Sequence, residues 1–150
     1  NVRSHLDRFS GTYYSFDLKD ATDRFPIALQ KELFSLIFGS KAAMAWEAVM
    51  IGLPYHYTLP DGSTGTAAYS SGQPMGAYSS WAVFSLTHHA ILQYIVSIHP
   101  KVGYAILGDD IVIRGEEGAR LYQEIMHTLG VPISEQKTHV SDVGFEFAKR

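Results

Sequence analysis

The chain has 150 residues, of which 46% are hydrophobic and 18% are charged, and its formal net charge at pH 7 is -3. This length and composition indicate one globular domain with a hydrophobic core and exclude a disordered chain. The absence of cysteine excludes disulfides and cysteine-ligated zinc, and the slightly acidic balance is not that of a free-standing nucleic-acid-binding protein, which usually carries a basic surface.

The first third of the chain predicts a strand and two helices. The aromatic run Thr12–Leu18 is rich in residues that favour strands, and it ends in the polar cluster KDATD. Pro26 suits a first helical turn, apolar residues recur at helical spacing as far as Phe38, and Gly39 is the expected C-cap. Strong helix formers predict the second helix over residues 41–51.

The middle third predicts a hairpin, a loop and a long helix. A PDG turn stands between two β-prone arms over residues 55–70, since proline presets φ and glycine allows a positive φ. The glycine-rich stretch SSGQPMGAYSS then leads into a helix that runs to about His99, before Pro100. Serine, threonine and histidine side chains along this helix argue against a membrane span.

The last third predicts a second hairpin, a helix and short strands. Residues 102–107 and 110–115 are apolar arms around the two-residue turn of Gly108 and Asp109. Residues 116–130 form an amphipathic helix with acids in its first turn, and residues 131–150 carry shorter strand-like runs. Because strands and helices do not alternate regularly, we expect an α+β fold, with an antiparallel sheet and helices packed on one face.

Acidic residues stand where two of the predicted strands end. Asp17 closes the first strand, and Asp109 lies at the tip of the second hairpin, next to Asp110. If the strands are neighbours, the carboxylates converge, and their repulsion favours a retained proton or a recruited cation. Hard oxygen ligands prefer Mg²⁺ or Mn²⁺ to zinc, and a pair of such ions assists phosphoryl displacement. The alternative is that these acids are ordinary solvated turn residues.

Other candidate residues have both a functional and a plain structural interpretation. Ser71, Gly72 and Gly76 precede a helix N-terminus, where backbone N–H groups can approach a phosphate or sugar, although such loops are commonly plain turns. Lys137 suits an acid or a point charge near a phosphate, or a solvated loop residue. His88 and His89 are adjacent on a helix and do not share a face, which favours packing or capping contacts over a zinc site.

The order of these features resembles the palm of viral RNA-dependent RNA polymerases, with motifs A to E in sequence. The likeness is strongest to the mitoviruses: DLKDATDRFP from Asp17 resembles their motif A, GQPMGAYSSWAVFSLTHH from Gly72 their motif B, and YAILGDD from Tyr104 their motif C. LGVPISEQKTHVS and FEFAKR resemble motifs D and E. The resemblance covers essentially the whole chain, and it implies that residues 1–150 are a palm with an RRM-like antiparallel core, mostly without fingers and thumb.

The resemblance implies an RNA-directed RNA polymerase of viral RNA replication that uses two Mg²⁺ (or Mn²⁺) ions. In that family Asp17 would bind both ions and Asp109 would be the essential motif C ligand. Asp110 would support the second ion or make an outer contact. Lys137 would protonate the leaving pyrophosphate.

The resemblance also implies substrate contacts and partners. Asp23 would accept a hydrogen bond from the ribose 2′-OH of the incoming nucleotide, and Ser80 stands where many relatives have an asparagine that helps to read this hydroxyl. Ser71 and Gly72 would form a flexible turn that contacts template and nucleotide. The implied partners are an RNA template, a primer or product strand, nucleoside triphosphates, and the fingers and thumb of the same polypeptide. The implied location is the mitochondrion.

Two other interpretations compete with the viral polymerase. One is a non-catalytic remnant, since mitovirus-like segments occur as integrated copies in plant genomes. The other is a reverse-transcriptase-like palm, which shares the metal chemistry; the glycine of GDD, the wording of motif B and Asp23 favour an RNA product. Asp20 departs from the family pattern, which has a small neutral residue there. Because the chain starts at Asn1 and stops directly after an apolar run, we expect a piece of a longer polypeptide that does not polymerise alone.

Overall fold

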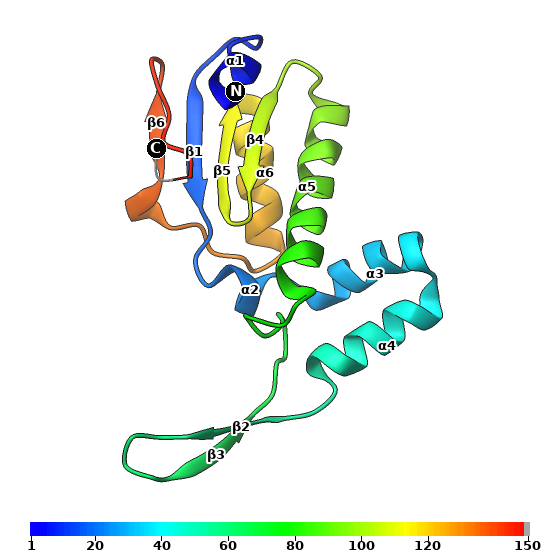
Figure 1. Ribbon diagram of the computed structural model, residues 1–150. Coiled ribbons are helices and arrows are strands. Elements are labelled where there is room, and N and C mark those ends of the chain that lie inside the picture. The colour runs from blue at the N-terminus through cyan, green and yellow to red at the C-terminus, as the bar shows by residue number, and fades with distance from the viewer. Residues whose placement is uncertain (149–150) are drawn as a thin grey trace.

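A four-stranded antiparallel sheet forms the centre of the computed structural model, which describes residues 1–148 (Figure 1). Its strands lie in the order β4 (Gly103–Leu107), β5 (Asp110–Arg114), β1 (Tyr13–Asp17) and β6 (His139–Ser141). A separate hairpin consists of β2 (Tyr55–Thr58) and β3 (Thr64–Ala67). The helices are α1 (Val2–Leu6), α2 (Ala21–Arg24), α3 (Ile27–Phe38), α4 (Ser40–Ile51), α5 (Ser80–Ile98), α6 (Glu116–Thr128) and the 3-10 turn η1 (Glu135–Lys137).

The two long helices α5 and α6 cover one face of the sheet, as Figure 1 shows. Side chains of a strand alternate between the two faces, so Phe16 and Leu18 point to these helices while Ser15 and Asp17 point away. Large apolar side chains from both helices are fully buried against the sheet: Phe84, Leu92, Ile95, Tyr122 and Met126. The predicted α+β architecture is therefore confirmed, and the face opposite α5 and α6 carries Ser15 and Asp17.

Short helix α1 covers one end of that opposite face and was not predicted. Leu6 packs there against Tyr13 and Val112 in a second small core. The helix has five residues, and its N-cap is Asn1, whose side chain accepts a hydrogen bond from the Arg3 amide. Five residues are too few to show a helical repeat in the sequence.

Single-turn helix α2 lies within the region that the sequence marks only as a polar cluster. Its N-cap is Asp20, with a left-handed φ of 51°. Asp adopts this conformation more readily than most residues because its short side chain can hydrogen-bond locally. Asp20, the acid that departs from the family pattern, thus adopts the left-handed backbone conformation at the start of α2.

Helices α3 and α4 form an antiparallel pair beside the sheet, and the hairpin β2–β3 extends beyond them (Figure 1). The pair is held by an ion pair of Lys31 with Glu47 at 2.7 Å and by the stacked rings of Phe34 and Trp46, whose centroids are 5.2 Å apart. The helices predicted over residues 26–38 and 41–51 and the hairpin predicted over residues 55–70 are confirmed, with ends shifted by one to three residues.

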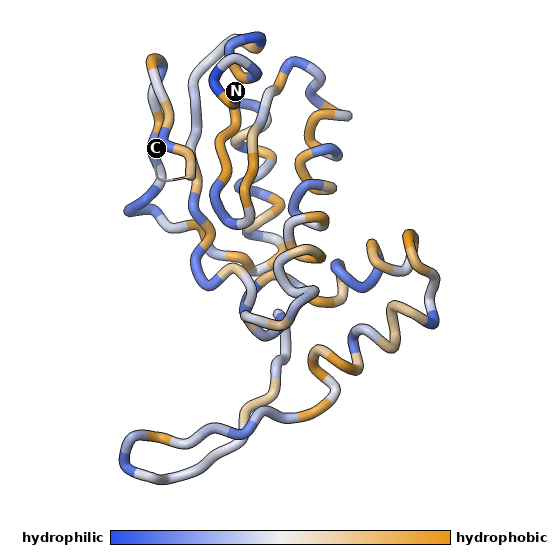
Figure 2. The backbone as a smooth tube through the Cα atoms, viewed as in Figure 1, coloured by the Kyte–Doolittle hydropathy of each residue, from blue (hydrophilic) through white to orange (hydrophobic). Residues whose placement is uncertain are grey.

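Hydrophobic stretches run along α3 and α4 at the surface, as Figure 2 shows. Leu36 and Val49 are both more than four-fifths exposed. Within the described residues, no helix is long and apolar enough to cross a membrane. The predicted strand-like runs of residues 131–150 are realised only as β6 and as one β-bridge of Ile133, and residues 149–150 lie outside the described part.

Candidate active site

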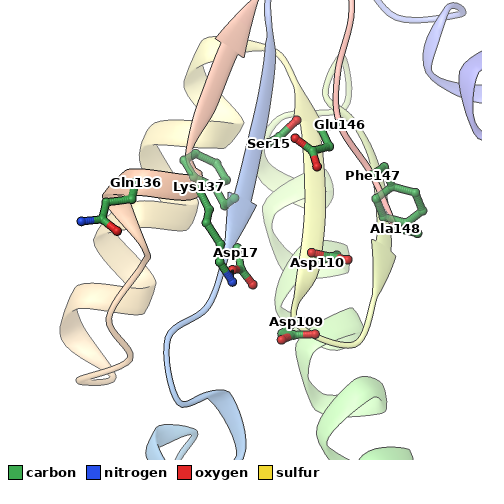
Figure 3. A pocket seen from close by; sticks show the side chains of 10 residues that line it. Ser15, Asp17, Asp109, Asp110, Gln136, Lys137, Glu146, Phe147 and Ala148 are labelled. Atoms are coloured by element: carbon green, nitrogen blue, oxygen red, sulfur yellow. Dashed lines mark ion pairs between the residues drawn. The ribbon is translucent and has the colours of Figure 1, made fainter. Parts of the chain in front are cut away.

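The pairing of β1 with β5 brings the predicted acids together. In this antiparallel pair Asp17 stands directly opposite Asp110, and such partners project to the same face of the sheet. Gly108 and Asp109 form the turn between β4 and β5, so Asp109 lies one residue beyond the pair. All three acids line one pocket of about 570 Å³ (Figure 3). Its remaining lining residues are Ser15, Phe16, Gln136, Lys137, Glu146, Phe147 and Ala148.

The segment after α6 returns along the end of β1 and carries Lys137 to this pocket. Leu18 forms a β-bridge with Ile133, and the Ser134 amide donates a hydrogen bond to the Asp17 carbonyl oxygen at 2.8 Å. The 3-10 turn η1 follows at once and ends at Lys137. The backbone of Asp17 therefore anchors the segment whose last residue reaches the Asp17 side chain.

An ion pair joins the Lys137 ammonium to Asp17 Oδ2 (Figure 3). The hydrogen bond and charge of Asp17, with smaller contributions from Asp109 and Asp110, raise the pKa of Lys137 above its ordinary value. Carboxylates directly opposite each other in a sheet repel, and Lys137 supplies a positive charge beside them. The Asp17 side chain is only 12% exposed, whereas the Lys137 side chain is 70% exposed, so water screens the ion pair from the lysine side.

The donors of this pocket suit Mg²⁺ or Mn²⁺, which prefer carboxylate oxygens. Within residues 1–148, however, the side chains do not form a ready cluster of three or more ligands. The Lys137 ammonium also contacts one of the candidate oxygens of Asp17. A metal ion that bound this oxygen of Asp17 would have to displace the Lys137 ammonium.

A second pocket of about 330 Å³ lies between α2, the glycine-rich loop and the start of α5. Asp23, Ser80 and Asp109 all line it, together with Leu18, Asp20, Ala21, Thr22, Met75, Gly76, Ala77, Trp81 and Phe84. Ser80 Oγ is buried and has no hydrogen-bond partner among the described residues. A buried hydroxyl without a partner is costly, so this oxygen is an unsatisfied polar atom at the wall of the pocket. Burial and the neighbouring Asp23 carboxylate raise the pKa of Tyr69.

The structure places Ser71 and Gly72 against the backbone of α2, outside both pockets. The Ser71 carbonyl accepts a hydrogen bond from the Ile27 amide at 2.7 Å. A Cβ atom on Gly72 would lie 2.1 Å from the Thr22 carbonyl oxygen and 2.4 Å from that of Asp23. This contact requires glycine and fixes the loop against the segment that carries Asp23.

Gly76, one of the loop glycines that the sequence singled out, lines the second pocket together with Met75 and Ala77, which the sequence did not single out. Gly76 has a φ of 91°, and a Cβ atom built on it would meet open space among the described residues. Buried Gln73 holds this part of the loop by donating hydrogen bonds to Gln30 Oε1 at 2.5 Å and to the Ser80 carbonyl at 3.1 Å. The sequence singled out both glycines of GQPMG but could not show which of the two lies in a pocket.

Replacing Gly72 with alanine is expected to destabilise the chain by about 1–3 kcal/mol, the usual cost of forcing a methyl group into a packed site. The new Cβ meets backbone atoms of Thr22 and Asp23, which cannot rotate away. Urea unfolding of the purified chain measures the change. Gly144→Ala is the control, because its Cβ would meet open space among the described residues. Equal unfolding midpoints for the two variants would contradict the close approach.

The histidines of α5 make separate contacts. His88 is fully buried, and its ring nitrogens lie 2.8 Å from the Gly108 carbonyl and 2.8 Å from the Tyr122 hydroxyl. Burial lowers the pKa of His88 to about 4. His89 is exposed, and its Nδ1 lies 2.6 Å from the Tyr104 hydroxyl. His88 and His89 thus have different partners on different faces of α5, which agrees with packing contacts rather than with a shared metal ion.

Comparison with protein families and curated proteins gives a consistent result. A family model described as mitovirus RNA-dependent RNA polymerase matches residues 2–150. The chain is 41% identical over 143 residues to the RNA-directed RNA polymerase of Cryphonectria parasitica mitovirus 1, covering 92% of this chain and 17% of that protein. It is also 40% identical over 146 residues to an uncharacterized mitochondrial protein of Arabidopsis thaliana, covering 91% of this chain and 57% of the relative. The chain thus spans less than two thirds of both relatives.

Solved structures of telomerase share the fold. The telomerase of Candida albicans, in complex with a fragment of telomeric RNA, superposes with a TM-score of 0.70 at 12% identity, covering 94% of this chain and 30% of that one. The apo telomerase of Candida tropicalis gives a TM-score of 0.68 at 14% identity, covering 98% and 35%. At these identities the likeness concerns the fold alone, and it confirms a palm-type fold.

Proposed function

The chain belongs to the mitovirus RNA-dependent RNA polymerase family, and we propose that it is the palm of an enzyme that synthesises RNA on an RNA template. The observation that carries this proposal is the strand register that sets Asp17 opposite Asp110, with Asp109 on the adjoining turn and Lys137 beside them. In this proposal residues 1–150 supply the palm. Fingers and thumb come from other parts of a longer polymerase, in keeping with the 17% of the viral relative that the chain spans.

The proposed reaction is nucleotidyl transfer. The primer 3′-oxygen forms a bond to the α-phosphorus of a nucleoside triphosphate, and the bond from that phosphorus to the pyrophosphate oxygen breaks. Asp17, Asp109 and Asp110 would hold two Mg²⁺ or Mn²⁺ ions, which lower the pKa of the hydroxyl and neutralise the triphosphate. Lys137 is protonated at neutral pH, like any lysine, and its raised pKa moves the loss of this proton further into the alkaline range. It would give this proton to the leaving pyrophosphate.

The second pocket is the proposed site of the nucleotide sugar. Asp23 and Ser80, whose hydroxyl has no hydrogen-bond partner among the described residues, line it together with Asp109, so a sugar bound there lies next to the acids. A 2′-OH can donate to the Asp23 carboxylate and bond to Ser80, which a deoxyribose cannot do. Ser71 and Gly72 would act on template and nucleotide through the loop that they hold against α2.

Replacing Asp23 with alanine is expected to lower the preference for ribonucleotides by roughly 10–150-fold, the equivalent of about 1.5–3 kcal/mol for a hydrogen bond to a charged group. The measurement is the ratio of kcat/KM for a ribonucleotide and its deoxy analogue, in a full-length polymerase that carries this palm. Asp61→Ala in the β2–β3 turn is the control for loss of an acid. An unchanged ratio of the two kcat/KM values in the Asp23 variant would show that Asp23 does not recognise the sugar.

Primer extension separates the competing functions. With RNA template and primer, an RNA polymerase adds ribonucleotides, whereas a reverse transcriptase prefers deoxyribonucleotides; a remnant adds neither. The remnant is not favoured, since Asp17, Asp109, Asp110 and Lys137 still line one pocket. A mitochondrial location is proposed from the relatives, one viral and one named as a mitochondrial protein.

A further inference from the structure

The carbonyl of Gly108, directly before Asp109, is held from within the core. His88 Nδ1 lies 2.8 Å from this oxygen, and His88 Nε2 lies 2.8 Å from the Tyr122 hydroxyl. A carbonyl oxygen can only accept, so Nδ1 carries the hydrogen and donates it. In the neutral ring Nε2 then accepts from Tyr122, which makes the orientation of the imidazole unique.

The outer side of the same turn rests on Trp81. Gly108 has a φ of 64°, and a Cβ atom there would lie 1.8 Å from the Trp81 ring. Trp81 and His88 are seven residues apart on α5, a spacing that places them on one side of a helix. Helix α5 thus contacts the turn at two points. The Trp81 ring lies against the Cα atom of Gly108, and His88 donates a hydrogen bond to the Gly108 carbonyl.

Tyr122 links this turn to the strand that carries the first acid. Its ring stacks on His88 with the centroids 5.7 Å apart, and on Phe16 with the centroids 5.4 Å apart. Phe16 directly precedes Asp17, just as Gly108 directly precedes Asp109. One row of buried rings therefore spans the distance between the backbones of the two acid-bearing segments. Packed rings resist compression, so this row fixes the separation of those backbones.

We propose that His88 is a positioning residue of the candidate metal site. By holding the Gly108 carbonyl, it orients the peptide that leads into Asp109 and so directs this carboxylate toward Asp17. The inference rests on the proposed function, since it concerns Asp109 as a metal ligand. A histidine that only filled space would serve as well without its hydrogen bond to Gly108.

A pair of amide substitutions separates the two hydrogen bonds of His88. In His88→Asn the side-chain N–H lies near the position of Nδ1 and can still reach Gly108, whereas in His88→Gln it extends to the position of Nε2, next to Tyr122. Mn²⁺ affinity of the chain, measured from the electron paramagnetic resonance of free Mn²⁺, is the readout. We expect the asparagine variant to stay within about threefold of wild type, and the glutamine variant to bind roughly 10–100-fold more weakly, the usual effect of losing an outer contact.

Matched controls make the outcome decisive. His89→Gln makes the same change on the exposed neighbour and is expected to leave the Mn²⁺ dissociation constant unchanged. Equal affinities for folded His88→Asn and His88→Gln would overturn the positioning role. If either variant does not fold, Tyr122→Phe removes only the hydroxyl that orients the ring; weaker Mn²⁺ binding in it supports the role, and wild-type affinity overturns it.

The proposed function is tested first and separately. Wild type and Asp109→Asn are titrated before any histidine variant. If wild type showed no Asp109-dependent Mn²⁺ binding, the proposed metal site would be wrong, and the proposed role of His88 would be wrong for the same reason. If that binding is present, a negative result with the His88 pair concerns the positioning role alone.

Discussion

Replacement of Asp109 with asparagine is expected to reduce nucleotide incorporation by roughly 10³-fold or more in a full-length polymerase that carries this palm. Asparagine keeps the shape of the side chain but removes one negative charge from the pocket shared with Asp17 and Asp110. Neutral amide oxygens hold a divalent ion less strongly than carboxylates do, and the loss of metal assistance removes several kcal/mol of transition-state stabilisation. The measurement is the single-turnover rate of primer extension on an RNA template.

The fold should survive this change, because the turn depends on Gly108 and its positive φ rather than on the charge of Asp109. The urea midpoint of the variant is therefore expected to stay close to that of wild type. Asp142→Asn is the matched control: Asp142 accepts a hydrogen bond from Thr12 Oγ1 at 2.6 Å, and asparagine can still accept it. Wild-type extension rates in Asp109→Asn would show that the metal assignment is wrong.

The fold follows from local patterns in the sequence wherever an element is long enough to repeat. The amphipathic pattern of α6 repeats over 13 residues, and the apolar arms around Gly108 are long enough to mark a hairpin. Helices α1 and α2 have five and four residues, less than two turns, and no period can be seen in them. Their position depends on tertiary contacts, such as Leu6 against Tyr13 and Val112.

The sequence predicted which acidic residues form the candidate site, but it did not predict the contacts that other residues make with them. Asp17 and Asp109 stand at predicted strand ends, and they converge on the condition, which the structure meets, that the two strands are neighbours in one sheet. The ion pair of Lys137 with Asp17 depends on a bridge between residues 18 and 133, a long-range pairing that no local pattern specifies. The same holds for the close approach of Gly72 to α2 and for the lack of a partner for Ser80 Oγ within residues 1–148, since both depend on neighbours distant in sequence.

Lys137 has two expected roles that act at different stages. Before metal binds, its ammonium neutralises Asp17 and competes with an incoming ion. During the reaction it would donate a proton to pyrophosphate, and its raised pKa sets the direction of the pH effect. The acid form is present below that pKa, so proton donation persists through neutral pH and is lost only as the pH rises through an alkaline value.

Replacement of Lys137 with methionine is therefore expected to change binding and rate in opposite directions. Mn²⁺ should bind more tightly, because the competing charge at Asp17 is gone, while incorporation should slow by roughly 10²–10⁴-fold, the usual contribution of a general acid. Electron paramagnetic resonance of free Mn²⁺ and single-turnover extension measure the two effects. Lys137→Arg separates charge from acidity, since arginine can still pair with Asp17 but does not release a proton near neutral pH. Slow extension with near wild-type Mn²⁺ affinity in that variant would assign the rate effect to proton donation, and a wild-type rate in Lys137→Met would exclude this role.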